Sequence, residues 1–326
     1  MRKLTLLLLL FTFLNCQKDD STNTNTPTQN EAIYYCSKLV STGSWQVYKK
    51  QFNSSVVETI TNNNAFNYWW VEPSPDKTQL LLLRSPITSP KDQFDYENCE
   101  MIKCNADGSN PQIIIADNQY GWFAFGNPHW HPNGDRILLI AQSQNSSTPF
   151  YTYTVDSNGN TPEALTTQYS IDTNWSASGN QITFIGIDAG GYVDATSFEV
   201  FTADYNYTSN SISSIQQVTA DATRNHDPCF SPDGSHIVFS ASNVNLTDAN
   251  LVTIETSGAN PTTILDDTGI HGGPLNWGSN GKIYHHSIYI GSTNFTINAF
   301  DAATNIDETL LANPNFGYIS PYYVHF

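Results

Sequence analysis

Five near-copies of one turn motif, Ser-Pro-Asp-Gly in its clearest form, constrain this chain more than any other feature. The clearest copy lies in FSPDGSHIVF, residues 230–239, and the others are PSPDK (73–77), WHPNG (130–134), WSASG (175–179) and WGSNG (277–281). The last residues of successive copies are 45 to 57 positions apart. A recurrence near fifty residues indicates a repeat architecture in which each period forms one structural unit.

Each copy predicts a tight hairpin. Proline fixes φ at the first corner, Asp bonds its own backbone, and Gly takes the positive φ that closes the turn. An apolar run follows every copy: QLLLLR, RILLIA, QITFIG, HIVFSA and KIYHHS. The aromatic residue ahead of the turn ends one strand and is suited to packing between neighbouring sheets.

A second hairpin recurs between these copies. Its instances are MIKCNADGSNPQIII, YTYTVDSNGNTPEALT, VFTADYNYTSNSISSIQQVT, LVTIETSGANPTTIL and INAFDAATNIDETLL, with a sixth, QVYKKQFNSSVVETIT, near the N-terminus. Two hairpins per period make a four-stranded sheet. Such a sheet is the blade of a β-propeller, so we predict an all-β fold.

The two ends of the chain predict how the propeller closes. One more period beyond Gly281 would place a sixth turn just past Phe326, so the last strand, roughly residues 318–326, is the innermost strand of an unfinished blade. AIYYCS, residues 32–37, supplies the missing strand ahead of the sixth hairpin. We therefore predict a six-bladed β-propeller with four antiparallel strands per blade, closed by the C-terminal strand plus three N-terminal strands.

The turn followed by a strand such as IVF closely resembles the repeat of TolB-like propellers, over nearly all of residues 32–326. The resemblance implies a fold and no single function. Such propellers include periplasmic TolB, the propeller domains of prolyl-oligopeptidase-type peptidases, oligogalacturonate lyases and many surface lipoproteins. A WD-repeat propeller lacks support because no Trp-Asp pair ends a strand, and a β-sandwich would not explain the period.

Residues 1–15 are predicted to be a lipoprotein signal peptide. Arg2 and Lys3 precede a leucine-rich run that is short for a membrane span. The run ends at Cys16 and resembles a bacterial lipoprotein signal, which implies that Cys16 is lipidated and anchors the protein to the membrane. The following QKDD resembles the export signal of Bacteroidetes surface lipoproteins, which implies an outer membrane lipoprotein exposed at the cell surface. An ordinary cleaved signal with a chance cysteine is the alternative.

Residues 16–31 are predicted to be a lipidated flexible tether, because residues 20–31 contain no apolar side chain. Residues 32–326 then form one propeller domain, which we expect to be a monomer. The chain has 13 Lys and Arg against 30 Asp and Glu, a formal net charge of −17. Such a surface repels phosphate backbones, so we expect no nucleic acid partner.

The cysteines beyond Cys16 give no disulfide framework. Cys36, Cys99, Cys104 and Cys229 are scattered, and none has C-x-x-C spacing. A Cys99–Cys104 bridge and free buried thiols both remain open.

Chemistry is expected at one mouth of the central channel, where each outer strand crosses to the next innermost strand. The sequence has no G-x-S-x-G elbow, no H-E-x-x-H and no Walker glycine loop. Aromatic, Asn, Asp and Arg residues concentrate in the crossovers and suit a sugar or a peptide segment. The alternative is that several of these rings simply wedge between blades. The predicted ligand-binding residues are Tyr120, Trp122, Phe123, His129, Asp172, Arg224, His226, Asp227, His271 and Tyr318.

Three of these histidines raise a metal hypothesis. His129, His226 and His271 come from different blades and would form a site for a divalent metal if they converged. The resemblance to oligogalacturonate lyases, which bind a divalent metal through propeller histidines, supports this, although order and spacing do not map residue by residue. Hydrogen bonds to neighbouring turns are the alternative, and no cofactor is otherwise expected.

We favour a surface-displayed binding module that recognises a polysaccharide, a peptide or an envelope protein through the crossover face. One alternative is a polysaccharide lyase or hydrolase, with His226 and His271 as acid and base groups and Arg224 neutralising a uronate. Another is a TolB-like envelope scaffold.

Overall fold

A computed structural model describes residues 31–40, 43–143, 149–187, 198–243, 245, 247–289, 292 and 294–326. The predicted signal peptide, Cys16 and the tether up to residue 30 lie outside the described residues. In the described part, no helix has the length and apolar character needed to cross a membrane.

Strands make up almost all of the regular structure, beside one 3₁₀ turn, η1 (Gln119–Gly121). Four sheets have four strands each. The first sheet consists of β24 (Phe316–His325), β1 (Glu31–Leu39), β2 (Gln46–Gln51) and β3 (Val57–Thr59), and the second of β4 (Phe66–Pro73), β5 (Gln79–Pro86), β6 (Glu100–Asn105) and β7 (Gln112–Ile115). The third consists of β8 (Trp122–Trp130), β9 (Arg136–Ser143), β10 (Phe150–Asp156) and β11 (Glu163–Ala164). The fourth consists of β12 (Ser170–Trp175), β13 (Gln181–Ile187), β14 (Phe198–Asn206) and β15 (Ser211–Gln217).

The remaining strands belong to one eight-stranded sheet. They are β16 (Arg224–Phe230), β17 (His236–Ser242), β18 (Ala249–Glu255), β19 (Thr262–Leu265), β20 (Gly269–Trp277), β21 (Lys282–Tyr289), β22 (Thr296–Asp301) and β23 (Ile306–Leu311).

The all-β propeller is confirmed, but the prediction of six blades with four strands each is wrong, because in the described part of the chain only four sheets have four strands and the other strands form one sheet of eight. The eight-stranded sheet consists of two antiparallel runs, β16 to β19 and β20 to β23, joined by a parallel bridge between Ala249 and Ile270. Only three residues separate β19 from β20. This short crossover holds the start of β20 against β18, so hydrogen bonding continues from one run to the next.

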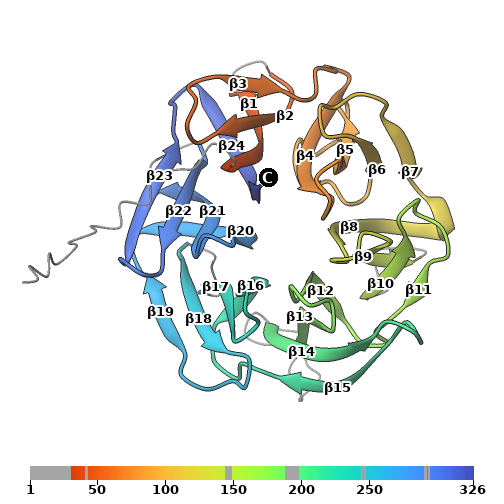
Figure 1. Ribbon diagram of the computed structural model, residues 1–326, viewed down its shortest axis with the longest axis vertical. Coiled ribbons are helices and arrows are strands. Elements are labelled where there is room, and N and C mark those ends of the chain that lie inside the picture. The colour runs from red at the N-terminus through yellow and green to blue at the C-terminus, as the bar shows by residue number, and fades with distance from the viewer. Residues whose placement is uncertain are drawn as a thin grey trace, which may run out of the picture.

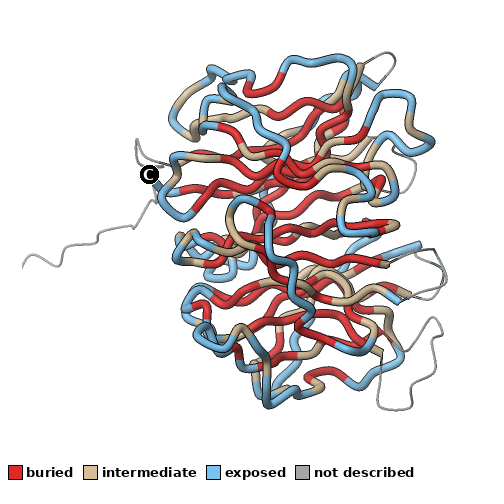
Figure 2. Tube along the Cα trace, turned by 90° about the vertical axis from the view of Figure 1, so that its right-hand side faces the viewer, coloured by how far each residue is buried: buried red, intermediate tan, exposed pale blue. Residues whose placement is uncertain are grey.

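The sheets stand around a central channel (Figure 1), and each four-stranded sheet has one strand nearest the axis, whereas the eight-stranded sheet has two. These inner strands are β4, β8, β12, β16, β20 and β24; each packs against the next, and β24 packs against β4. Figure 2 shows that burial follows the strands, whereas the exposed residues gather in the loops at their ends.

The predicted closure of the ring by both chain ends is confirmed. β24 pairs with β1 from the Glu31–His325 pair to the Leu39–Phe316 pair. Closure also places buried aromatic rings together, since Tyr323 stacks on Tyr284 of β21 at 5.1 Å. The three N-terminal strands therefore obtain their inner neighbour from the other end of the chain.

The five turn motifs form equivalent hairpins, each after an inner strand. In every one the first turn residue donates its amide to the carbonyl five residues on, or four at Gly278, at 2.8 to 2.9 Å. At the clearest copy, Ser231 and Ser235 donate to Asp233, and these bonds lower the pKa of Asp233 to about 2. We call the mouth with these hairpins the turn face, and the mouth where the inner strands begin the crossover face.

Candidate ligand-binding site

The inner strands share a bulge about halfway along. The pairing of β4, β8, β12, β16 and β20 with the next strand out shifts register there. Asn127, Asp172, Asp227 and Ser320 lie at the bulge with φ between 47° and 54°. Asn and Asp tolerate this left-handed conformation better than most residues. A bulge interrupts the alternation of side chains, and here it turns polar groups toward the axis.

Polar groups at the bulge bond from one inner strand to the next. Asn127 Nδ2 donates to Asp172 Oδ1 at 2.8 Å, and the Asp227 amide lies 3.4 Å from Asp172 Oδ2. The Gly273 amide donates to Asp227 Oδ2 at 3.0 Å. These contacts join β8, β12, β16 and β20. We call Asn127, Asp172, Asp227 and Gly273 the axial belt.

Asp227 is the belt residue whose ionised carboxyl group is least stabilised by its surroundings. Burial, followed by the negative charge of Asp172, raises the pKa of Asp227 to about 7, although His226, the Gly273 amide and His129 act in the opposite direction. Around neutral pH the two carboxyl groups therefore hold a proton for part of the time. Positive charge brought to the belt would favour the ionised form.

A cavity of about 380 Å³ occupies the channel between the belt and the turn face. We call it the funnel; its volume is in the range of small-molecule sites. Every inner strand contributes to its wall, with the aromatic residues Trp70, Trp130, Trp175, Phe230, Trp277 and Tyr322 and the polar residues Glu72, His129, Asn174 and Asn276. Trp70, Trp130 and Trp175 are buried, whereas Asn174, Asn276, Trp277 and Tyr322 are partly exposed.

A buried histidine and a buried carboxyl group meet in the funnel wall. His129 Nδ1 is 2.8 Å from Glu72 Oε2, and both side chains are less than one-tenth exposed. Glu72 Oε1 accepts the Trp130 amide at 3.0 Å, and the Tyr322 hydroxyl lies 3.5 Å from it. Glu72 thus links β4 to β8 and β24.

The segment between β5 and β6, residues 87–99, crosses the channel at the crossover face. The Tyr96 hydroxyl donates to Asn127 on β8 at 2.8 Å, and the Tyr96 ring packs edge-on against Trp69 at 5.4 Å. The Phe94 ring lies 6.3 Å from that of His286 on β21. Because β8 and the β20–β21 hairpin stand on opposite sides of the ring, the segment obstructs this mouth.

Comparison with known proteins defines the fold. No known family profile matches the chain, and no curated protein matches its sequence. Among solved structures, TolB from Acinetobacter baumannii is similar with a TM-score of 0.68 at 13% identity, over 92% of this chain and 68% of that one. The chain has a TolB-like propeller fold.

Two more solved structures resemble this TolB-like propeller. A putative TolB from Agrobacterium tumefaciens has a TM-score of 0.61 at 16% identity, over 92% of this chain and 100% of that one. Hydrazine synthase from Kuenenia stuttgartiensis has a TM-score of 0.65 at 12% identity, over 91% of this chain and 47% of that one. At these identities the likeness shows the fold alone, so function has to be argued from the site.

The TolB-like propeller uses several predicted ligand-binding aromatics for packing. Trp122 is buried between Tyr120, Phe125 and Tyr153, with ring centroids 5.1 to 6.1 Å away. Tyr318 packs against Tyr35 at 6.0 Å, and Phe123 is partly exposed. Tyr120 is 41% exposed, and its hydroxyl donates to the Gly159 carbonyl. Among these four, only Tyr120 is an exposed ring.

The predicted polar residues separate into three places. His129 lies in the funnel, and Asp172 and Asp227 lie in the belt, with His226 Nδ1 3.5 Å from Asp172 Oδ2. The Arg224 guanidinium covers the Phe198 ring at 4.7 Å. His129 and His226 therefore face different carboxylates, and in the described part no three His, Cys, Asp or Glu side chains are grouped to hold a metal ion.

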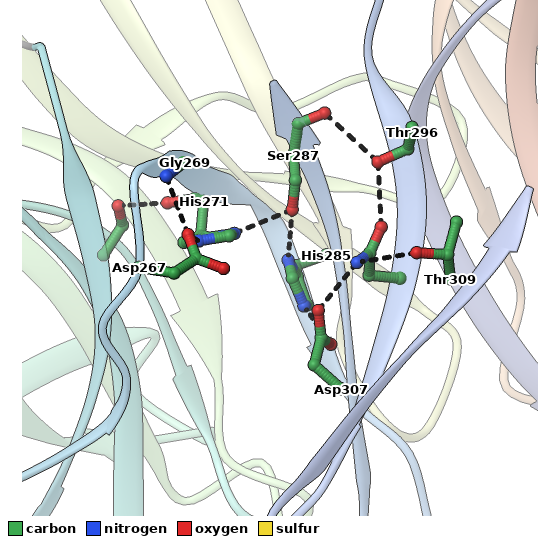
Figure 3. Close-up of polar contacts among 10 residues, drawn as sticks. Asp267, Gly269, His271, His285, Ser287, Thr296, Asp307 and Thr309 are labelled. Carbon is green, nitrogen blue, oxygen red and sulfur yellow. Dashed lines mark hydrogen bonds and ion pairs between the residues drawn. The ribbon is translucent and has the colours of Figure 1, made fainter. Parts of the chain in front are cut away.

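His271 lies in a buried relay of hydrogen bonds (Figure 3). Its Nε2 is 2.7 Å from Asp267 Oδ1, and its Nδ1 is 2.8 Å from Ser287 Oγ. Ser287 Oγ is also 3.0 Å from His285 Nδ1, and His285 Nε2 is 3.0 Å from Asp307 Oδ1. His271, His285 and Ser287 are fully buried. The arrangement joins β20, β21 and β23 and offers no surface to a substrate.

Donor counting constrains this relay. Ser287 has one O–H, so it can donate to only one of the two Nδ1 atoms that face it. Burial lowers the pKa of His271. Burial opposes ionisation of Asp307 as well, yet bonds from His285 and Asn298 lower its pKa. Asp307 is therefore the ionised acceptor at the end of the relay.

The cysteines are free and buried: Cys36, Cys99, Cys104 and Cys229. The Cys99–Cys104 bridge is therefore not formed. Cys229 lines the funnel, but burial raises the pKa of its thiol to about 12. A thiol that stays protonated at neutral pH is a poor nucleophile.

The funnel and the belt residue Asn127 were missed at the sequence level, although a signal exists. Prolines follow the bulge residue in Asn127-Pro128, Asp227-Pro228, Gly273-Pro274 and Ser320-Pro321, each a few positions before the aromatic end of its strand. Proline cannot donate to a sheet, so inside a strand it marks a bulge. The recurrence therefore indicates where polar side chains turn toward the axis.

The packing of Tyr96 against Gly126 at the crossover face predicts that one methyl group added at Gly126 destabilises the protein. A Cβ at Gly126 would lie 2.1 Å from the Tyr96 ring, so Gly126→Ala should displace the 87–99 segment and lower the free energy of unfolding by about 1–3 kcal/mol. Gly272→Ala on β20 is the matched control, since its Cβ would meet nothing nearer than Asp227 at 3.7 Å. Urea denaturation measures both, and equal stability of the two variants would show that Tyr96 does not occupy this place.

Proposed function

We propose that this propeller is a binding module that takes the end of a linear ligand, a peptide or glycan chain, into the funnel. The observation that carries the proposal is the position of the cavity, on the axis and open at the turn face. Its wall combines aromatic rings with Asn174 and Asn276 amides, a lining suited to stacking and hydrogen bonding along a narrow ligand.

The shape of the channel favours a chain end over an internal segment. The axial belt closes the funnel at its base, and Phe94 and Tyr96 obstruct the mouth beyond it. A ligand that enters at the turn face therefore has no straight way out at the crossover face. The proposed ligand therefore enters at the turn face, and not at the crossover face that the residues of the crossovers favoured in the sequence.

Membrane attachment through a lipid on Cys16, with display at the cell surface, is part of the same proposal. Its support is the sequence of the leader and of the QKDD segment. Because Glu31 pairs with His325 at the end of β24, the tether joins the propeller at the turn face. Fifteen residues span at most about 50 Å, so an anchored propeller would hold the funnel near the membrane.

Tryptophan fluorescence of the full chain, titrated with peptide and glycan oligomers, tests the site. We expect Trp277→Ala and Asn174→Ala to weaken binding at least tenfold, because both side chains are partly exposed in the funnel wall. Tyr120→Ala is the control in the crossover before β8, and it should leave affinity within twofold. The reverse pattern would place the ligand at the crossover face and contradict the proposal.

The lyase alternative has less support from the geometry. It requires His226, His271 and Arg224 to share one site, but Arg224 lies over Phe198 and His271 is fully buried beside Asp267. We therefore propose that the site binds its ligand without catalysis. A protein partner in envelope assembly would be one source of the bound chain.

A further inference from the structure

We propose that the funnel recognises a primary ammonium group at the tip of a slender chain, held at the base of the funnel between Asp172 and Asp227. This inference rests on the proposed function and names the ligand chemistry of the same site. Three observations carry it: the size of the space at the base, its excess of hydrogen-bond acceptors, and its lack of a resident cation.

The space at the base fits one small polar group. A second cavity, of about 10 Å³, lies against Asp172, Thr173 and Asp227, and it shares His129 and Asn174 with the wall of the funnel. Such a volume holds about one water molecule. An ammonium head is of similar size, so the tip of a chain that fills the funnel can end there.

The acceptors at the base outnumber the donors. In the part of the chain that the structure describes, Asp227 accepts the Gly273 amide through Oδ2, and no bond to its Oδ1 is formed. Thr173 is 1% exposed, and its hydroxyl has no partner among the described residues. An ammonium group has three N–H donors and no acceptor. A carboxylate oxygen of Asp227 and the Thr173 hydroxyl are the complement of such a group.

The charges around the base also favour a cation. Among the described residues, neither Lys nor Arg lines the small cavity, and the one lysine in the funnel wall, Lys77, bonds the His325 carbonyl near the turn face. Asp172 on β12, His226 on β16, His129 on β8 and Tyr96 of the 87–99 segment are the titratable groups around Asp227. Asp172 and Asp227 are the carboxyl groups that an added cation would meet at the base.

Proton release should accompany binding. Burial and Asp172 together raise the pKa of Asp227 to about 7, so an arriving ammonium displaces the proton that the carboxyl pair holds near pH 6. Affinity should therefore rise between pH 6 and pH 8, where Asp227 is already ionised.

The wall above the base suits an aliphatic stem. From Asp227 to Phe230 the β16 strand covers about 10 Å. Trp70, Trp277 and Tyr322 line this stretch. Aromatic rings attract a cation during entry and then contact its hydrocarbon chain.

Isothermal titration calorimetry of the full chain compares 1,8-diaminooctane with 1,8-octanediol, which has the same chain without charge. We expect the diamine to bind at least tenfold more tightly. Asp227→Asn should weaken diamine binding about tenfold or more and abolish proton release at pH 6, measured in buffers of different ionisation enthalpy. Asp107→Asn, in an exposed turn, is the control and should stay within twofold.

Two further ligands identify the natural source of the ammonium group. Trialanine amide against its N-acetylated form tests a peptide end, and spermidine tests a free polyamine. Preference for the free peptide amine or for spermidine supports the inference and assigns the source.

Equal binding of diol and diamine, or an Asp227→Asn variant that binds like wild type, would overturn the inference. Binding of neutral chains that Trp277→Ala weakens would then preserve the proposed function alone. Binding of Ca²⁺ or Mg²⁺ that needs both aspartates and excludes the diamine would make this a metal site and also overturn it. If no chain binds, both proposals fail.

Discussion

A chain that ends at Asn315 should lose cooperative folding altogether. The truncation removes β24, whose Ile319, Tyr323 and Val324 side chains are buried, and it strips the inner neighbour from β1. Each buried side chain contributes about 1.5–3 kcal/mol. The newly exposed faces of Tyr34 and Trp69 add to the loss. The sum is comparable to the whole stability of a typical domain, about 5–15 kcal/mol.

Thermal denaturation followed by circular dichroism measures this effect. The truncated chain should show no cooperative transition, whereas a chain that ends at His325 should melt like wild type, because Phe326 lies at the exposed end of the chain and is not paired in β24. A truncated chain with a wild-type transition would mean that the ring does not depend on joining its two ends.

Asp307→Ala should lower the free energy of unfolding by about 2–5 kcal/mol, because two buried groups lose their acceptor and each such loss costs about 1–3 kcal/mol. Asp307 is 3.0 Å from His285 Nε2 and accepts Asn298 Nδ2 at 2.7 Å. Its loss leaves the His285 ring and an amide without an acceptor inside the sheet. Glu308→Ala is the neighbouring control. Glu308 is exposed and 3.7 Å from Lys282, so its loss should cost less than about 1 kcal/mol.

The pH dependence of the free energy of unfolding distinguishes the contribution of an ionised Asp307 from that of packing alone. The pKa of Asp307 is lower in the folded protein than in the unfolded chain. Its stabilisation is therefore complete above the unfolded pKa, near 4, and disappears as pH falls through the folded pKa. The difference between wild type and Asp307→Ala should be full at pH 7 and shrink below pH 4. A difference that stays constant with pH would contradict an ionised Asp307 in the relay.

The strands and their closure follow from local chemistry that the sequence displays. The turn at residues 230–234 closes by bonds among its own residues, and the apolar run after it needs only a sheet to bury it. Repetition of that unit predicts the propeller, and AIYYCS at the other end predicts the partner of the last strand. The eight-stranded sheet was not predictable in this way, because one bridge between Ala249 and Ile270 decides it.

The candidate site divides between sequence and tertiary structure. Asp172, Asp227 and His129 are prominent in the sequence as polar residues of the predicted crossovers, and the structure places all three on inner strands beside the axis. Glu72 and Asn174 gave no comparable signal, since each gains its role from residues tens of positions away. The aromatic residue Trp122 stood out by composition, yet it packs between its neighbours.

By itself, the sequence determined the hairpins, the period, the all-β propeller and the strand that closes it, because turn chemistry and the alternation of apolar residues act over a few adjacent positions. Only the tertiary structure decided which mouth of the channel is open. That choice depends on where residues 87–99 pack and on the bond from Tyr96 to Asn127. Contacts between distant strands depend on the three-dimensional path of the backbone, which no local pattern specifies.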